Sequence, residues 1–120
     1  MAFSLNTRKS GDVVIIDMSG RLSIGEAVLL LRTTIRRFLE DGTLKFVLNL
    51  GNVSHIDSAG LGELVSTYTS VRNRGGDAKL LNLDKKAKDL LQMTKLLTVF
   101  DVYDDEAKAI AALKAAKTSA

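Results

Sequence analysis

The chain has 120 residues, with 17 Lys and Arg against 14 Asp and Glu, a single His, and no Cys, Pro or Trp. Without cysteine it cannot form disulfides, thiolate nucleophiles, iron–sulfur clusters or Cys-built zinc sites, and one His cannot supply the paired-His metal motifs. The 46% hydrophobic and 26% charged residues are typical of a globular protein, and the length suits one domain over residues 1–120. The net charge of +3 is scattered among acids, so it gives weak support for an acidic partner.

The apolar stretches are short. The longest, such as 13–16 and 27–31, fall far below the roughly 20 residues that a membrane helix needs. Residues 1–12 lack the basic and apolar segments of a secretion signal. Together with the missing cysteines, these features predict a cytoplasmic protein with no membrane partner.

The first elements are a hairpin and a helix. Polarity alternates over Phe3–Lys9, Ser10-Gly11 has turn chemistry, and Val13–Met18 is an apolar run, which together predict a β-hairpin. Apolar residues then recur at helical spacing over Glu26–Glu40, and Asp41-Gly42 is a suitable helix end. The expected buried stripe of this helix is Val28, Leu31, Ile35, Phe38 and Leu39.

The middle of the chain predicts a strand, a helix and another strand. Leu44–Leu50 is nearly continuously apolar, as in a strand buried on both faces of an α/β layer. Ala59–Arg74 has helical spacing and stops at Gly75-Gly76, and Lys79–Leu83 reads as the next strand. The expected buried stripe of the helix is Leu61, Leu64, Val65, Tyr68 and Val71.

The last third predicts two more helices around a short strand. Lys85–Thr94 is the third helix, with Ala87, Leu90 and Leu91 inward, and a strand follows near Val99–Tyr103. Asp104 and Asp105 are favourable before a fourth helix, whose expected buried stripe is Ala107, Ile110, Ala111 and Leu113, and residues 117–120 are expected to fray. This alternation predicts an α/β fold with a mixed, mainly parallel sheet of about five strands, an N-terminal hairpin and four helices.

Catalytic motifs are missing from the sequence. It has no G-x-x-x-x-G-K-[ST] phosphate loop, no complete G-x-G-x-x-G fingerprint and no G-x-S-x-G nucleophile elbow. Gly60-Leu61-Gly62 comes closest but lacks the third glycine. Because no acid, base and nucleophile set can be assembled, we expect no enzyme activity, no cofactor and no metal.

Polar residues gather in Asn52–Glu63, expected as the loop between the central strand and the second helix. Loops at the carboxyl ends of parallel strands are where ligands and partners bind. Ser58 falls at or next to the helix N-cap with its hydroxyl expected to be exposed, while Gly60 and Gly62 are expected to keep the first turn free of bulk. A helix N-terminus favours an anionic group, so a phosphate on Ser58 would be tolerated. Position alone favours the commoner role for this serine, a helix cap.

Other polar residues carry weaker signals. His55 is expected to be a loop histidine with ordinary hydrogen bonds, since no second His or Cys completes a nucleophile pair or metal site. Asp57 is expected to orient the loop or to cap the helix. The scattered arginines and lysines indicate a solvated face and no direct nucleic-acid binding, because no recognition motif or aromatic platform accompanies them.

The segment IDSAGLGELV after an apolar strand, followed by RGG and the strand KLLNL, resembles the STAS domain of bacterial anti-sigma factor antagonists. The resemblance covers most of the chain, from Gly20-Arg21-Leu22 to LLQMTKLLTVFDVYDDEAKAIAAL. It implies partner switching: the unmodified antagonist binds an anti-sigma factor, often a serine protein kinase, and thereby frees a sigma factor for transcription. It further implies that the kinase uses ATP to phosphorylate Ser58, and that a PP2C-type phosphatase restores the binding form.

The resemblance also implies which residues contact the partner, and two positions depart from the family pattern. Ser23 stands where many relatives have an acid, and Lys95 stands where a glycine is usual after the third helix. Whether the chain forms a homodimer is left open. The expected partner-binding residues are Ser23, His55, Asp57, Ser58, Ala59, Gly60, Leu61 and Gly62.

Two other functions compete with the switch. One is a non-switching STAS scaffold or accessory subunit, in which Ser58 is only a helix cap. The other is a nucleotide or small-molecule sensor that uses helix N-termini around the same loop, for which the incomplete glycine pattern is weak support.

Overall fold

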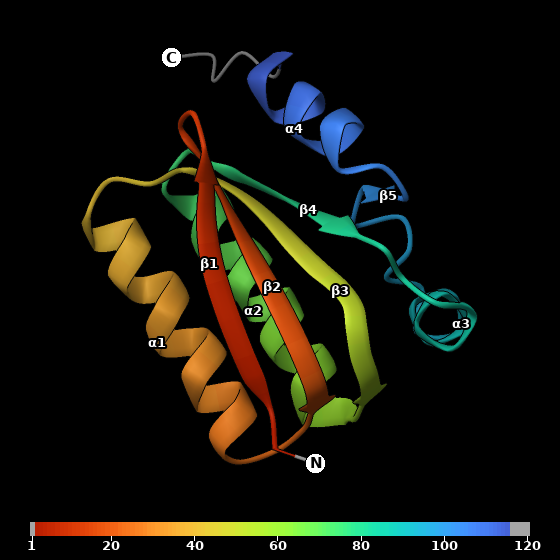
Figure 1. Cartoon of the computed structure of the whole chain (residues 1–120). Coiled ribbons are helices and arrows are strands. Elements are labelled where there is room, and N and C mark those ends of the chain that lie inside the picture. The colour runs from red at the N-terminus through yellow and green to blue at the C-terminus, as the bar shows by residue number, and fades with distance from the viewer. Residues whose placement is uncertain (1, 116–120) are drawn as a thin grey trace.

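The computed structural model describes residues 2–115 as a five-stranded sheet with four helices (Figure 1). The α/β class, the N-terminal hairpin and the numbers of strands and helices are as predicted. The fraying expected for residues 117–120 lies outside the described residues. The elements are β1 (Ser4–Ser10), β2 (Val13–Leu22), α1 (Glu26–Glu40), β3 (Lys45–Ile56), α2 (Ser58–Asn73), β4 (Asp77–Leu81), α3 (Lys85–Met93), β5 (Val102–Tyr103) and α4 (Glu106–Ala115).

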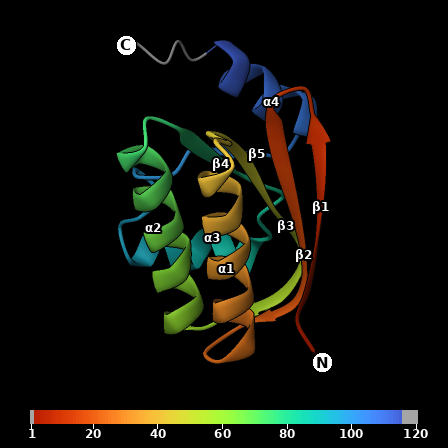
Figure 2. The same cartoon turned by 90° about the vertical axis from the view of Figure 1, so that its left-hand side faces the viewer.

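The strands lie in the order β1-β2-β3-β4-β5. β1 and β2 form the predicted antiparallel hairpin, closed by the Ser10–Val13 pair, and the three following pairings are parallel. Gly11 in the turn has φ 61°, a conformation that glycine adopts without strain. The crossover helices between the parallel strands place the N-terminal ends of α1 and α2 at the carboxyl ends of β2 and β3 (Figures 1 and 2).

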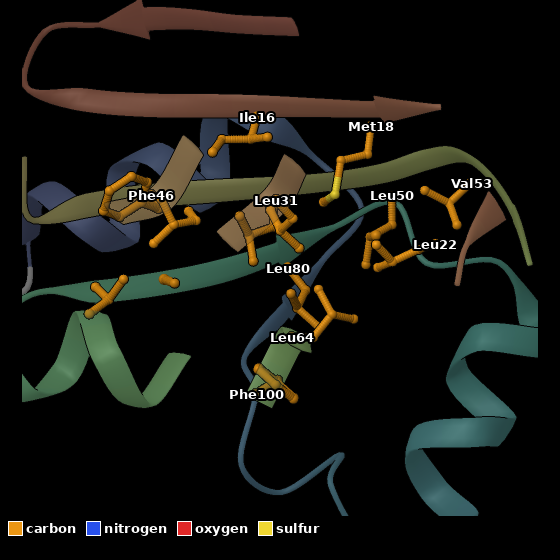
Figure 3. Close-up of a cluster of buried hydrophobic side chains, with 14 of the residues drawn as sticks. Ile16, Met18, Leu22, Leu31, Phe46, Leu50, Val53, Leu64, Leu80 and Phe100 are labelled. Carbon is orange, nitrogen blue, oxygen red and sulfur yellow. The ribbon is translucent and has the colours of Figure 1, made fainter. Parts of the chain in front are cut away.

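The sheet is covered on both faces, as the apolar run of the central strand predicted. Alternate residues of β2 point to opposite faces, so Val14 and Ile16 pack in the large core under α1 and α2, while Val13 and Ile15 pack in a smaller core under α4. Figure 3 shows part of the large core, where Ile16 and Phe46 from the sheet lie near Leu31 from α1. The large core therefore fixes α1 and α2 against one face of the sheet.

β3 is longer than its apolar run predicted. It continues from Lys45 to Ile56, so the polar segment 52–55 is the end of a strand and not a loop. The reason is the pairing with β2, where register shifts between Asp17 and Ser19 and between Gly20 and Arg21 continue the ladder beyond Leu50. Polar side chains are tolerated there because the irregular end turns them to solvent.

The buried face of α4 differs from the expected one. Ala107 and Ala111 are exposed, whereas Ala109 and Leu113 are fully buried in the small core and Ile110 packs beside them. An alanine-rich helix has several faces of similar polarity, so its periodicity did not identify the face that docks. Among residues 2–115, no helix has both the length and the apolar character to cross a bilayer.

Candidate functional site

The candidate site is the junction between β3 and α2. β3 ends at Ile56, Asp57 is the N-cap, and Ser58 is the first residue of α2. Leu22, the last residue of β2, pairs with Ile56, so the loop that leads to α1 starts beside the same junction. The site therefore lies at the carboxyl end of the parallel sheet, as predicted from the sequence (Figure 1).

Asp57 holds two backbone segments together. Its Oδ1 accepts a hydrogen bond from the Gly60 N–H at 2.8 Å, and its Oδ2 accepts one from the Ile24 N–H at 3.0 Å. The Gly60 bond satisfies an amide that the helix leaves unpaired, and the Ile24 bond ties the β2–α1 loop to the start of α2. These backbone donors lower the pKa of the Asp57 carboxyl, because they favour its charged form. The expectation that Asp57 caps the helix is confirmed.

Ser58 is exposed at the first position of α2, as expected. It is not the N-cap, so the interpretation of this serine as the helix cap is wrong: the Asp57 carboxylate takes that role. Within residues 2–115 the Ser58 hydroxyl makes no hydrogen bond with the protein. Because this hydroxyl faces solvent and makes no contact that the fold needs, the active site of another protein can reach it.

Gly60 has a different role from the one expected. It is buried, and a Cβ at this position would lie 2.0 Å from the Leu22 backbone oxygen. The glycine therefore permits close packing of α2 on the end of β2 and does not keep an outer surface open. Leu61 is also buried, at 8% exposure, whereas Ala59 is half-buried and Gly62 is exposed with open space around it.

The β2–α1 loop adds an apolar contribution to the site. Ser23 is half-buried, and the next residue, Ile24, is 79% exposed, although its amide is fixed by Asp57. Leu29 and Leu30 on α1 are 57% and 41% exposed. Sequence reasoning missed these three residues; for the two leucines, the available signal was their position outside the buried stripe of α1.

His55 is exposed in β3, where its register partner is Arg21. It is therefore a strand residue and not the expected loop residue, and within residues 2–115 its imidazole makes none of the expected hydrogen bonds. Its proximity helps to keep the Asp57 pKa low. Among the described residues, no cluster of three or more His, Asp or Glu side chains is arranged to hold a metal ion.

Comparisons with known proteins match this architecture over most of the chain. The STAS domain family model matches residues 4–109. A Thermotoga maritima protein, provisionally named an anti-sigma factor antagonist, is 32% identical over 99 residues, which cover 82% of this chain and 88% of that protein. A crystal structure of a Thermotoga maritima protein with the same provisional name has a TM-score of 0.85 at 29% identity and covers 92% of this chain and 94% of its own. The anti-sigma-B factor antagonist of Bacillus subtilis is 26% identical over 102 residues, 85% of this chain and 92% of that protein.

A further structural neighbour is SpoIIAA, an anti-sigma factor antagonist solved in two states. The unphosphorylated form has a TM-score of 0.70 over 95% of this chain and 99% of its own, at 24% identity. The phosphorylated form, from Bacillus, has a TM-score of 0.72 over 92% of this chain and 98% of its own, also at 24% identity. This likeness concerns the fold. The resemblance found in IDSAGLGELV is confirmed by these matches, and the chain belongs to the STAS domain family, with curated relatives named as anti-sigma factor antagonists.

Proposed function

We propose that this protein is an anti-sigma factor antagonist that regulates transcription by phosphorylation-dependent partner switching. Unmodified, it binds an anti-sigma factor that is itself a serine kinase; phosphorylation of Ser58 releases it, and a PP2C-type phosphatase reverses the modification. In this proposal residues 1–120 form one cytoplasmic STAS domain that has no catalytic activity of its own. The observation that carries the proposal is the exposed Ser58 hydroxyl at the start of α2, which no structural role occupies.

The separate roles of Asp57, which caps the helix, and Ser58, which does not, support a reversible switch. Because the Asp57 carboxylate caps α2, modification of Ser58 removes no hydrogen bond that holds the fold. The helix N-terminus places unpaired amides and the positive end of the helix dipole near the phosphate. The domain is thus expected to stay folded in both states, and SpoIIAA, which has this fold, is known in an unphosphorylated and a phosphorylated form.

The surface around Ser58 has the features of a protein interface. Ile24 provides an exposed apolar side chain on a tethered loop, and Leu29 and Leu30 extend that apolar character along α1. Covering such apolar side chains with a partner surface lowers the free energy of the complex. The proposed contact surface also includes Ser23, His55, Asp57, Ala59 and Gly62. The buried Gly60 and Leu61 lie beneath this surface and contribute by packing.

The proposed release follows from charge. A phosphate adds about −1.5 to −2 charges and three acceptor oxygens beside the Asp57 carboxylate. A hundredfold loss of affinity needs only about 2.7 kcal/mol, which one repelled or poorly solvated phosphate at an interface supplies. No large conformational change is required.

A phosphorylation assay tests the proposal. The kinase partner is first isolated by pull-down with the unmodified protein, then incubated with the protein and ATP, and the products are analysed by mass spectrometry. We expect one phosphate on Ser58, no labelling of Ser58→Ala, and full labelling of Ser54→Ala, a control at another exposed serine near the end of β3. Labelling confined to another residue rejects the assignment.

The non-switching scaffold makes a different prediction. If Ser58→Asp leaves both partner affinity and domain stability unchanged, the switch loses its support and the scaffold is favoured, with the phosphorylated protein as the control for an imperfect mimic. The sensor that would bind nucleotides at this loop loses part of its support, because the side of Gly60 on which a Cβ would lie is filled by the Leu22 backbone and is not open to a ligand.

A further inference from the structure

A polar groove lies between α1 and α2, the two helices that face the viewer in Figure 2. Its volume is about 660 Å³, within the range of small-molecule sites. Its floor includes the apolar Ile35 and Leu39 of α1, and polar residues of both helices form its walls. Ser58 is not part of it, so a function of this groove is independent of the proposed phosphorylation.

The α2 side of this groove is polar where a neighbouring helix would ordinarily meet apolar side chains. Glu63, Ser66, Thr67 and Ser70 recur at intervals of three and four residues, so they form one stripe of the helix, and this stripe lines the groove. Glu63 and Thr67 are 4% and 2% exposed. Burying polar groups costs free energy unless they are paired, and departures from ordinary packing rules are expected at functional sites.

Thr67 is the unexplained member of that stripe. Its hydroxyl oxygen is buried and, within residues 2–115, has no hydrogen-bond partner. A valine of the same shape would avoid this cost, so the fold gives no reason for a hydroxyl here. Its position in the lining of the groove points to a partner that comes from outside the chain.

The cations of the groove are partly held in place. Arg32 donates two hydrogen bonds to Glu63 Oε1, at 3.1 Å from Nε and 2.9 Å from one terminal nitrogen, and Arg74 donates to the Leu39 carbonyl at 3.2 Å. Arg36, one turn after Arg32 on α1, makes no ion pair within residues 2–115. Three arginines against one glutamate leave the groove a net charge of about +2, which suits a dianion.

We propose that the α1–α2 groove binds a small organic phosphate, a phosphomonoester on a hydroxyl-bearing body of sugar size. The phosphate, with about −1.5 to −2 charges, matches the groove's excess charge. Arg36 binds two of its oxygens, as arginine commonly does, and Arg32 contributes the terminal nitrogen that Glu63 does not occupy. The hydroxyls of the body pair with Ser66 and Ser70, and with the orphaned Thr67 hydroxyl once the ligand uncovers this oxygen, which is closed to solvent in the free protein. Ile35 and Leu39 support its apolar face.

Isothermal titration calorimetry of the whole chain tests this proposal. The probes are glucose 6-phosphate, ribose 5-phosphate and glycerol 3-phosphate, each compared with its unphosphorylated counterpart and with inorganic phosphate. At least one phosphomonoester is expected to bind with a Kd of about 1 mM or tighter, and at least about tenfold more tightly than both its counterpart and inorganic phosphate. Failure of all three phosphomonoesters to bind overturns the proposal.

Variants place the binding in the groove. Arg36→Gln is expected to weaken the bound probe about tenfold or more, whereas Arg37→Gln, at an exposed arginine of the same helix outside the groove, leaves its affinity unchanged. Thr67→Val is expected to weaken binding while keeping or raising the melting temperature, a combination that a purely structural role would not produce. Equal effects of Arg36→Gln and Arg37→Gln, or unchanged affinity in Thr67→Val, contradict the assignment.

Discussion

The molecule contains two strand-to-helix junctions that begin in the same way. At the β3–α2 junction the Asp57 carboxylate caps the helix by accepting from the Gly60 N–H at 2.8 Å. At the β4–α3 junction Asp84 does the same with the Ala87 N–H, also at 2.8 Å. Both lie at the carboxyl end of a parallel strand, so the cap itself is a structural device that carries no functional signal.

The differences between the junctions show what is special about the first. Asp57 also accepts from Ile24, which fixes the loop before α1, whereas the described hydrogen bonds of the Asp84 side chain are limited to the Ala87 amide. The first helical residue is the small, exposed Ser58 in one case and the long, charged Lys85 in the other. An exposed serine hydroxyl therefore occurs where a second segment is anchored beside it.

The largest expected contrast concerns the third residue of each helix. Gly60→Ala places a Cβ 2.0 Å from the Leu22 oxygen, so it should destabilise the fold by about 3 kcal/mol through overpacking. Ala87→Gly, at the matching and half-buried position of α3, should cost only about 1 kcal/mol. Urea unfolding of both variants checks this, and a Gly60→Ala cost equal to or below that of Ala87→Gly would contradict the close packing of α2 on β2.

The next contrast concerns the two caps. Asp84→Ala should lower the free energy of unfolding by about 1 kcal/mol, the usual cost of a lost cap. Asp57→Ala should cost more, about 2 kcal/mol, because the Ile24 amide loses its acceptor as well. Chemical denaturation measures both; equal losses would show that the Ile24 bond contributes nothing.

The pH dependence of the Asp57 contribution sharpens this comparison. Backbone donors lower the folded-state pKa of Asp57 below its ordinary value of 3.8, so the carboxylate contributes stability at pH values above 3.8. That contribution is lost as the pH falls below 3.8 through the folded-state pKa. The unfolding free-energy difference between wild type and Asp57→Asn should therefore be constant near neutral pH and shrink in acid. A difference independent of pH would be inconsistent with the charged cap.

The smallest effects are expected at the first helical positions. Ser58→Ala and Lys85→Ala should each change the free energy of unfolding by no more than about 0.5 kcal/mol, because both residues are exposed and neither is the cap. Thermal and urea unfolding are the measurements. If Ser58→Ala lowers the free energy of unfolding by about 1 kcal/mol or more, the serine has a structural role and the account is wrong on this point.

The sequence predicted much of this organisation because its local signals were strong. Helical periodicity and Asp41-Gly42 gave the bounds of α1 in full, and the exposure of Ser58 followed from its place at a helix start. Which residue caps α2 was ambiguous in the sequence, since Asp and Ser are both favourable caps. The backbone conformation at the end of β3 makes Asp57 the N-cap.

Other features depend on contacts between distant segments. The extension of β3 to Ile56 follows from its irregular pairing with β2, and the position of the Ile24 backbone is fixed by a hydrogen bond to a residue 33 positions away. The burial of Glu63 and Thr67 depends on how closely α1 approaches α2. Periodicity within one segment does not contain such information, so these features appear only in the folded chain.

The most direct test of the central claim is the affinity of the purified kinase-type anti-sigma factor for the unmodified and the Ser58-phosphorylated protein. Titration calorimetry, with circular dichroism and thermal unfolding of both forms, gives affinity and folding together. We predict binding about a hundredfold weaker for the phosphorylated protein, with helix content and melting temperature preserved. Equal affinity for both forms, or a phosphorylated domain that has unfolded, would contradict the account.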